Sequence, residues 1–388
     1  MTSMIPAADS WNVRLVGHCD LGGHGDAMHI NVTDDGYAYV GHMGDSRVGT
    51  SIVDVREPSD PRLVAQLETP VGTHSHKVQV VGDLLAVNYE RNPSETSETW
   101  EAGVRIFDIS DREHPAPVGF FATPGKGVHR LTYWNHPYAF VSGSDDGYTD
   151  QFLQIVDLTD PAHPVETGRW WFPGMHTAGG EKPSWPENRR VAVHHAIVRG
   201  DRAYVGMWDG GLVILDISDL TRPSMISHLE FDGGSGATHT ALPLPGRDVL
   251  VVTDEAISDG DAEPHKRVRM VDISDETNPV VLGLVPIPEG DFVNRGGRFG
   301  PHNIHENRPG SFQSSDRIYL TYFNGGLRVL DVSDPTAPTE IAYCVPEAPR
   351  GRPAIQFNDI FVDRNGLIYA SDRFTGGLYI MELDLPSS

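Results

Sequence analysis

The segment ILDISDLTRP (residues 214–223) carries the pattern that decides the fold. An apolar run precedes an aspartate, a short polar turn follows, and a proline closes the segment. Five other segments share this order: IVDVREPSDP (52–61), IFDISDREHP (106–115), IVDLTDPAHP (155–164), MVDISDETNP (270–279) and VLDVSDPTAP (329–338). The shared acids are Asp54, Asp108, Asp157, Asp216, Asp272 and Asp331, and a degenerate copy, LYIMELDLP (378–386), has Glu382 at this position.

The copies lie about 50 to 60 residues apart, which is the length of a four-stranded propeller blade with variable loops. Around residues 191–231 the sequence predicts four strands in succession: VAVHHAIV, RAYVGMW, GLVILDI and SMISHLEF. No segment convincingly predicts a helix. We interpret the repeated turns as architecture, because Asp and Ser side chains close such turns by hydrogen bonds to the backbone and Pro fixes φ.

The two ends of the chain complement each other. The last copy lacks an outer strand, whereas WNVRLVGHCDL (11–21) is typical of an outer strand without a blade. Pairing them predicts an all-β, seven-bladed β-propeller, closed by the N-terminal strand on the C-terminal blade, with no open sheet edge. A single domain then spans residues 1–388, with the closing strand at 1–20, a loop or lid insertion at 170–190, and blades at roughly 21–70, 71–123, 124–173, 191–232, 236–288, 299–346 and 354–386.

The strings GLVILDISD (211–219) and LQIVDLTDP (153–161) resemble the LVIVD-repeat β-propeller family, and related strings cover essentially the whole chain. The resemblance implies the fold. It implies no single activity, because one fold carries many functions.

Composition narrows the class of function. Thirty basic and fifty-four acidic residues give a net charge of −24, which repels nucleic acid and anionic lipid. The N-terminus has no secretory signal pattern and no apolar run approaches membrane-spanning length, so we expect a soluble, cytoplasmic protein. The expected partner is a small-molecule substrate, with no nucleic acid, membrane or obligate protein partner. Two cysteines, Cys19 and Cys344, are expected to pack as small apolar residues, too far apart for a disulfide.

The predicted inner strands share a histidine. They begin DAMHINV (26–32), HSHKVQV (74–80), GVHRLTY (127–133), AVHHAIV (192–198), ATHTALP (237–243) and GPHNIHE (300–306), and the seventh, QFNDIFV (356–362), offers Asn358 or Asp359. Inner strands line the axis of a propeller, so one register forms one ring of side chains. The ring comprises His29, His76, His129, His194, His239 and His302.

Six imidazoles at one level favour a metal, because imidazole binds iron, copper, zinc and nickel. We therefore predict all six as metal ligands, while three or four of them could suffice and the others could support these. A repeated histidine that only hydrogen-bonds the neighbouring blade is the alternative. Adjacent side chains alternate along a strand, so only one of His194 and His195 should face the axis; the register favours His194.

Charged residues surround the ring at the end where the longest loops are expected. Glu306, Asp359 and Arg298 are candidate catalytic residues, the two carboxylates as proton-transfer groups. Arg130, Arg298 and Arg373 are candidates for binding a cofactor or co-substrate, because an arginine can hold a carboxylate in bidentate fashion.

A metalloenzyme is the leading hypothesis. The ring is similar by architecture to the His-lined propellers of carotenoid-cleavage oxygenases and selenium-binding-type oxidases. We expect a non-haem iron(II) oxygenase or oxidase that acts on a small polar molecule, with copper, manganese, nickel and zinc as other candidate metals and 2-oxoglutarate as a candidate co-substrate. A metal-dependent hydrolase, isomerase or lyase is the first alternative, and a non-catalytic interaction scaffold the second. No serine-hydrolase elbow, Walker loop or dinucleotide fingerprint is present.

Overall fold

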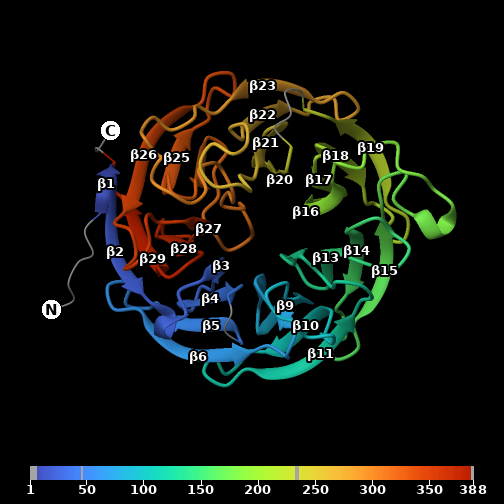
Figure 1. Ribbon diagram of the computed structural model, residues 1–388, viewed down its shortest axis with the longest axis horizontal. Coiled ribbons are helices and arrows are strands. Elements are labelled where there is room, and N and C mark those ends of the chain that lie inside the picture. Colours follow the sequence, from blue (N-terminus) through green and yellow to red (C-terminus); the bar gives the residue numbers. More distant parts are fainter. Residues whose placement is uncertain (1–6, 45–46, 232–235, 386–388) are drawn as a thin grey trace.

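The computed structural model describes residues 7–44, 47–231 and 236–385. Residues 1–6, 45–46, 232 and 386, which fall within the predicted closing strand and blades, lie outside the described residues. Radially arranged antiparallel sheets form a ring, with the inner strand of each sheet nearest the centre and the outer strand at the rim (Figure 1). The protein is therefore an all-β propeller. The helical segments among the described residues are two short 3-10 turns, η1 (Leu21–Gly23) and η2 (Thr177–Gly179).

The strands follow one another around the ring in chain order (Figure 1). The first sheet contains β3 (Ala27–Val32), β4 (Tyr37–His42), β5 (Val48–Asp54) and β6 (Arg62–Glu68), and the second β7 (Thr73–His74), β8 (Val78–Val81), β9 (Leu84–Arg91), β10 (Gly103–Asp108) and β11 (Ala116–Ala122). The third contains β12 (Arg130–Thr132), β13 (Tyr138–Gly143), β14 (Phe152–Asp157) and β15 (Val165–Trp170).

An eight-stranded sheet comes next, because β17 and β20 pair through Trp208 and Thr238. Its strands are β16 (Val191–Arg199), β17 (Arg202–Trp208), β18 (Leu212–Asp216), β19 (Ser224–Leu229), β20 (Thr238–Pro243), β21 (Val249–Asp254), β22 (Val268–Asp272) and β23 (Val280–Leu284). The two remaining sheets contain β24 (Arg317–Thr321), β25 (Leu327–Asp331) and β26 (Thr339–Pro346), and β27 (Phe357–Val362), β28 (Ile368–Asp372) and β29 (Gly377–Leu383).

Both of these last sheets take their outer strand from the N-terminal segment. β2 (Val13–Cys19) pairs antiparallel with β29, so that Val13 lies opposite Leu383. β1 (Ala7–Trp11) pairs with β26, a contact that the sequence did not predict. The start of the chain thus holds two neighbouring sheets together.

The apolar core lies between neighbouring sheets rather than at the centre. Phe152 of β14 and Val205 of β17, for example, belong to one fully buried cluster. The β-branched and aromatic residues of the repeats fill these layers, because successive side chains on a strand point to opposite faces. The centre of the ring is left to polar side chains.

The repeated aspartates close turns, as the sequence predicted. Each of the six accepts a hydrogen bond from the backbone N–H two residues later; in Asp272 the acceptor is Oδ1 and the donor is Ser274, at 2.8 Å. Such local bonds fix the turn geometry. These carboxylates are structural.

Two glycines let one sheet approach the histidine segment of the next. A Cβ atom at Gly41 of β4 would lie 2.7 Å from the His76 carbonyl oxygen, and one at Gly206 of β17 would lie 2.5 Å from the His239 carbonyl oxygen. Real Cβ atoms do not approach backbone so closely, so glycine is required there. The close approach brings successive histidines within contact distance.

Residues 170–190 do not cover the centre. Most of this segment, including η2, projects from the outer rim of the ring between β15 and β16 (Figure 1). His176 stacks on Tyr148 at 4.5 Å between ring centroids, and Phe172 packs against His228 of the outer strand β19. The expectation that this segment forms a lid over the histidines is wrong, because its aromatic side chains anchor it to the rim.

If the repeated aspartates serve only the turns, Asp272→Ala should lower the melting temperature by roughly 1 to 3 °C, because one backbone N–H loses its acceptor. Asp272→Asn keeps an acceptor oxygen and should lose less. Differential scanning calorimetry of both variants tests this. A calcium-dependent melting temperature in the wild type, abolished in Asp272→Ala, would contradict a purely structural role.

Candidate metal centre

The predicted ring histidines meet at the centre of the propeller. His29, His76, His194, His239 and His302 are each at most 3% exposed, and His129 is partly buried. The rings of five of them contact one another in sequence: the centroids are 5.0 Å apart for His76 and His129, 5.0 Å for His129 and His194, 4.0 Å for His194 and His239, and 4.5 Å for His239 and His302. Five imidazoles therefore form one continuous array.

Backbone bulges aim these side chains inward. The strand register shifts at the histidine position in β3, β16 and β20, and at the matching position in β27. An extra residue in one strand re-aims a side chain and breaks the simple alternation of faces. His194 and His195 are consequently both buried at the centre, whereas strict alternation allowed only one. Residues 300–306, expected as a strand, have only an isolated bridge, between Ile304 and Leu320.

Three of the histidines have a proton on Nδ1. His194 Nδ1 donates to the His239 carbonyl oxygen at 3.2 Å, and His302 Nδ1 donates to the Asn358 carbonyl oxygen at 2.6 Å. His129 Nδ1 donates to Glu90 Oε2 at 3.1 Å. A neutral imidazole has one N–H, so Nε2 of each ring presents a lone pair. This is how histidine ligands of metals are usually oriented.

Two of these lone pairs face each other. His129 Nε2 and His194 Nε2 are 3.3 Å apart. Two acceptors at hydrogen-bond distance repel unless a cation lies between them. Nitrogens that each lie about 2.1 Å from one metal ion are roughly 3.0 to 3.4 Å apart at angles between 90° and the tetrahedral value, so the observed separation fits a shared metal.

His239 and Glu255 extend this set of donor atoms. One ligand atom from each of His194, His239 and Glu255 lies within 4.8 Å of the others, and His239 Nε2 is buried without a hydrogen-bond partner among the described residues. His302 Nε2 lies 3.6 Å from Glu255 Oε1. Two histidines and one carboxylate form the ligand set of many non-haem iron(II) sites. The residues present thus fit a divalent transition metal.

In two other predicted ligands, His29 and His76, Nδ1 accepts a hydrogen bond instead of donating one. His29 Nδ1 accepts from the Val78 N–H at 3.3 Å, and His76 Nδ1 accepts from Asn88 Nδ2 at 3.2 Å. The Asn88 amide cannot be turned around, because its Oδ1 accepts from the backbone N–H groups of His76 and Lys77. Nε2 of both rings therefore carries the proton, and in this neutral form it is a donor rather than a metal ligand.

Glu90, which the sequence analysis did not single out, supports His129. Besides the bond from His129 Nδ1, its carboxylate accepts from His74 Nε2 at 3.1 Å and from Gln151 Nε2 at 3.3 Å. Burial acts to raise the pKa of Glu90, but His129 and His74 outweigh it and lower the pKa to about 2. The sequence signal that could have pointed to Glu90 is its charge, near the end of the otherwise largely apolar strand β9.

A polar crosslink spans the centre below the histidines. Arg130 and Glu306 come from segments on opposite sides of the ring, beside β13 and before β24, and their side chains meet at 2.8 Å. Arg130 also donates to Asn303 Oδ1 at 2.9 Å, and Glu306 Oε1 lies 3.5 Å from His195 Nε2. These contacts occupy the Glu306 carboxylate and the Nη1 and Nη2 groups of Arg130.

The remaining predicted residues border the cluster. Asp359 Oδ2 accepts from the Ile30 N–H at 2.8 Å and lies 3.7 Å from His29 Nε2; burial raises the pKa of Asp359 to about 6. Arg298 donates to Glu255 Oε1 at 2.9 Å. The guanidinium of Arg373 lies 5.6 Å from the centroid of the Phe323 ring, which stacks on His302.

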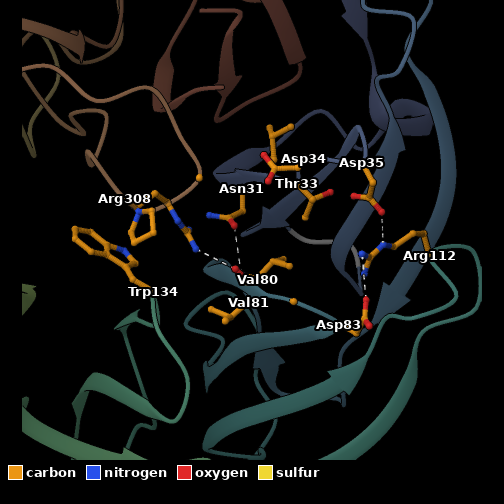
Figure 2. Close-up of a pocket in the computed structure, with 14 residues that line it drawn as sticks. Asn31, Thr33, Asp34, Asp35, Val80, Val81, Asp83, Arg112, Trp134 and Arg308 are labelled. Carbon is orange, nitrogen blue, oxygen red and sulfur yellow. Dashed lines mark hydrogen bonds and ion pairs between the residues drawn. The ribbon is translucent and has the colours of Figure 1, made fainter. Parts of the chain in front are cut away.

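Two hollows lie near the axis, at opposite ends. One of about 380 Å³, at the histidine end, is lined by Asp26, Met28, Met43, Arg352 and Arg373 among others. The other, of about 420 Å³, lies at the turn end, where Arg308 reaches the Val80 carbonyl oxygen and Arg112 pairs with Asp35 and Asp83 (Figure 2). None of the central histidines is among the residues that line either hollow.

Burial lowers the pKa of six central histidines well below the ordinary value: His29, His76, His194, His195, His239 and His302. The folded state keeps them neutral, whereas the unfolded chain protonates them below pH ~6.5. Stability should therefore be fully present above that pH and fall as the pH drops below it. Asp359, whose pKa burial raises, opposes this trend as a single group.

We expect the melting temperature of the metal-free protein to fall by on the order of 10 °C between pH ~7.5 and ~5.5. His195→Asn, which removes one of the six groups, should make this dependence smaller without abolishing it. His163→Gln, at an exposed turn, should leave it unchanged. Calorimetric scans across the pH range measure it, and a flat profile in the wild type would contradict neutral, buried histidines.

No helix among the described residues is both long and apolar enough to cross a membrane. No curated protein matches the sequence. Solved structures that resemble the fold include the WD40 repeats of RRP9 (12% identity, TM-score 0.63, covering 98% of this chain and 99% of that one) and the β-propeller domain of Cps50 (Swd1) from Myceliophteria thermophila (15%, 0.56, 97% and 100%). A chain of a mitotic checkpoint complex also matches (11%, 0.60, 100% and 97%).

These similarities establish the fold alone, since the identities are low. The family model for the LVIVD repeat matches residues 24–69, 138–170, 193–230 and 315–345. The matched segments contain Asp54, Asp157, Asp216 and Asp331, four of the repeated turn aspartates. Together with the propeller architecture, they identify the chain as an LVIVD-repeat β-propeller protein.

Proposed function

We propose that this protein is a metal-dependent oxidoreductase of the oxygenase type, with a non-haem iron(II) ion bound by the central histidines. The observation that carries the proposal is the 3.3 Å separation of His129 Nε2 and His194 Nε2, whose other ring nitrogens each donate a hydrogen bond. Such an arrangement calls for a cation between the two rings. His239, His302 and Glu255 supply further donor atoms around the same point.

The residues around the donor atoms have distinct tasks. Glu90 and the carbonyl oxygens of His239 and Asn358 hold the rings in the tautomer that leaves Nε2 free. Arg298 holds the Glu255 carboxylate by a hydrogen bond to Oε1, and Glu255 would be one of the residues that hold the metal. Iron(II), when bound by such a mixed set with open positions, supplies dioxygen activation. Buried walls exclude water from the centre.

The substrate is proposed to be a small polar molecule, with 2-oxoglutarate as a candidate co-substrate. Arg373 lines the hollow at the histidine end, and Arg298 lies beside the Phe323 ring, with 5.5 Å between the guanidinium carbon and the centroid. Arg373 is the arginine proposed to hold an acidic molecule that enters from this end, whereas Arg298 is already paired with Glu255.

A metal-dependent hydrolase, isomerase or lyase is the second candidate. It is favoured by the carboxylates Asp359 and Glu306 near the histidines, since a carboxylate beside a bound water or a substrate C–H group can act as general base. Dependence on dioxygen separates the two candidates.

We further propose that the propeller has seven blades and that the last blade is completed by β2. The pairing of β2 with β29 and of β1 with β26 supports this. A ring closed in this way has no open sheet edge and holds the central histidines in one rigid frame.

The first test is the metal content of protein purified without an affinity His-tag. We expect near-stoichiometric iron after anaerobic incubation with Fe(II), and an at least tenfold loss of affinity in His194→Ala and His239→Ala, since each removes one of the central ligands. Inductively coupled plasma mass spectrometry gives the content, and an oxygen electrode then tests for substrate-dependent oxygen uptake.

The matched control is His163→Ala, which removes an exposed histidine that pairs only with Asp160 among the described residues. It should bind as much iron as the wild type. If the wild type holds no metal and binds neither iron nor copper, nickel, manganese or zinc, a shared proton is the cation between His129 and His194, and the proposal fails.

A further inference from the structure

The donors on one side of the array lack acceptors. His76 Nε2 and Arg130 Nε are buried and have no hydrogen-bond partner among the described residues. Lys77 is 2% exposed, and its ammonium makes no hydrogen bond or ion pair with any described residue. A buried donor without an acceptor costs free energy comparable to a lost hydrogen bond, and a buried charge costs more. From these three donors, we propose that Lys77, with His76 and Arg130, binds the carboxylate of a small organic acid at the centre of the propeller.

Lys77 is held at the centre by its backbone. Its N–H donates to Asn88 Oδ1 at 2.7 Å, and its carbonyl oxygen accepts from the Asn88 N–H at 3.2 Å. The positive charge of Lys77 contributes to lowering the pKa of His29, His76, His194, His195, His239 and His302 alike, as expected for an ammonium that faces all of them. No carboxylate of the described residues forms an ion pair with it, in contrast to Arg130 and Arg298.

Arg130 and His76 supply fixed donors: His76 precedes Lys77 in the chain, and Arg130 follows His129, whose ring centroid lies 5.0 Å from that of His76. Arg130 uses Nη1 and Nη2 for Asn303 and Glu306, which fixes the plane of the guanidinium and leaves Nε–H free. His76 carries its proton on Nε2, because Asn88 donates to its Nδ1. The Nε–H groups of His76 and Arg130 and the ammonium of Lys77 are thus without an acceptor among the described residues.

The charge balance favours a monoanion. Arg130 is paired with Glu306, and Glu255 is paired with Arg298. Lys77 and Arg373 remain as cations without a carboxylate partner among the described residues, against the single carboxylate of Asp359, which accepts the Ile30 N–H, so one positive charge is left over. One carboxylate neutralises the ammonium, whereas a phosphate dianion would add a second charge near Glu255, Glu306 and Asp359. The flat, two-oxygen carboxylate also suits one ammonium and two N–H donors.

The proposed route of entry for the acid is the hollow at the histidine end. Arg373 lines the hollow of about 380 Å³, and its guanidinium makes no hydrogen bond or ion pair with the described residues. Burial lowers the pKa of Lys77 to about 7, with contributions from the charges of Arg130 and Arg373, so a bound carboxylate would favour the charged ammonium. An acid entering past Arg373 would move from one cation to the next. That the bound acid is a substrate or co-substrate rests on the proposed function; the anion site itself does not depend on a metal.

The test is isothermal titration calorimetry of the metal-free protein at neutral pH and low salt, with malonate and 2-oxoglutarate as probes. We expect binding by the wild type, a loss of affinity of about tenfold or more in Lys77→Met, and a smaller loss in Lys77→Arg, which keeps the charge. Equal affinities of wild type and Lys77→Met, or tighter binding of phosphate than of malonate, would overturn the inference.

A measurement on the wild type avoids dependence on a buried substitution. Reductive methylation followed by peptide mass spectrometry reports the accessibility of each lysine. Malonate should protect Lys77 several-fold and leave Lys126, an exposed lysine, unprotected. Equal labelling of Lys77 with and without malonate would also overturn the inference. Metal content, measured separately, shows whether the proposed function fails for its own reasons.

Discussion

Each imidazole at the centre of this propeller has two buried nitrogens and, when neutral, a single hydrogen. Every ring must therefore be assigned one donor and one acceptor, and the surrounding sheets make that assignment. The carbonyl oxygens of His239 and Asn358 and the carboxylate of Glu90 turn lone pairs inward, whereas the Val78 N–H and the Asn88 amide turn protons inward. The array thereby has an acceptor side and a donor side, and the proposed chemistry follows from this division.

The repeat made the fold and the histidine register predictable. Aspartate turns at a regular spacing specify four-stranded units, and a closed ring brings one register of each inner strand to the axis. The protonation pattern was not predictable, because the partners that decide it come from other strands: Asn88 lies twelve residues from His76, and the acceptor of His194 belongs to His239. The local sequence around each histidine does not identify these partners.

The structure differs from the sequence-based prediction at two other places, and the pattern of apolar and polar residues along a strand does not reveal the physical cause of either difference. The register shift between Val191 and His195 allows both His194 and His195 to face inward, and a bulge leaves little trace in composition. Residues 170–190 have the length expected of a lid, but Phe172 and His176 find aromatic partners on the rim. Loop length predicts that a segment extends from the sheet, and side-chain packing decides where it lies.

The division of the array also constrains how a substrate can bind. An organic acid held by Lys77 and Arg130 on the donor side would lie close to the Nε2 lone pairs of His129 and His194 on the acceptor side, since the His76 and His129 ring centroids are 5.0 Å apart. One carboxylate would then be anchored while the rest of the molecule extends toward the metal. With its carboxylate anchored at one fixed position and the metal held at an adjacent one, the bound acid would be oriented for reaction. Fixing this orientation is the main contribution that a rigid ring of sheets can make to catalysis.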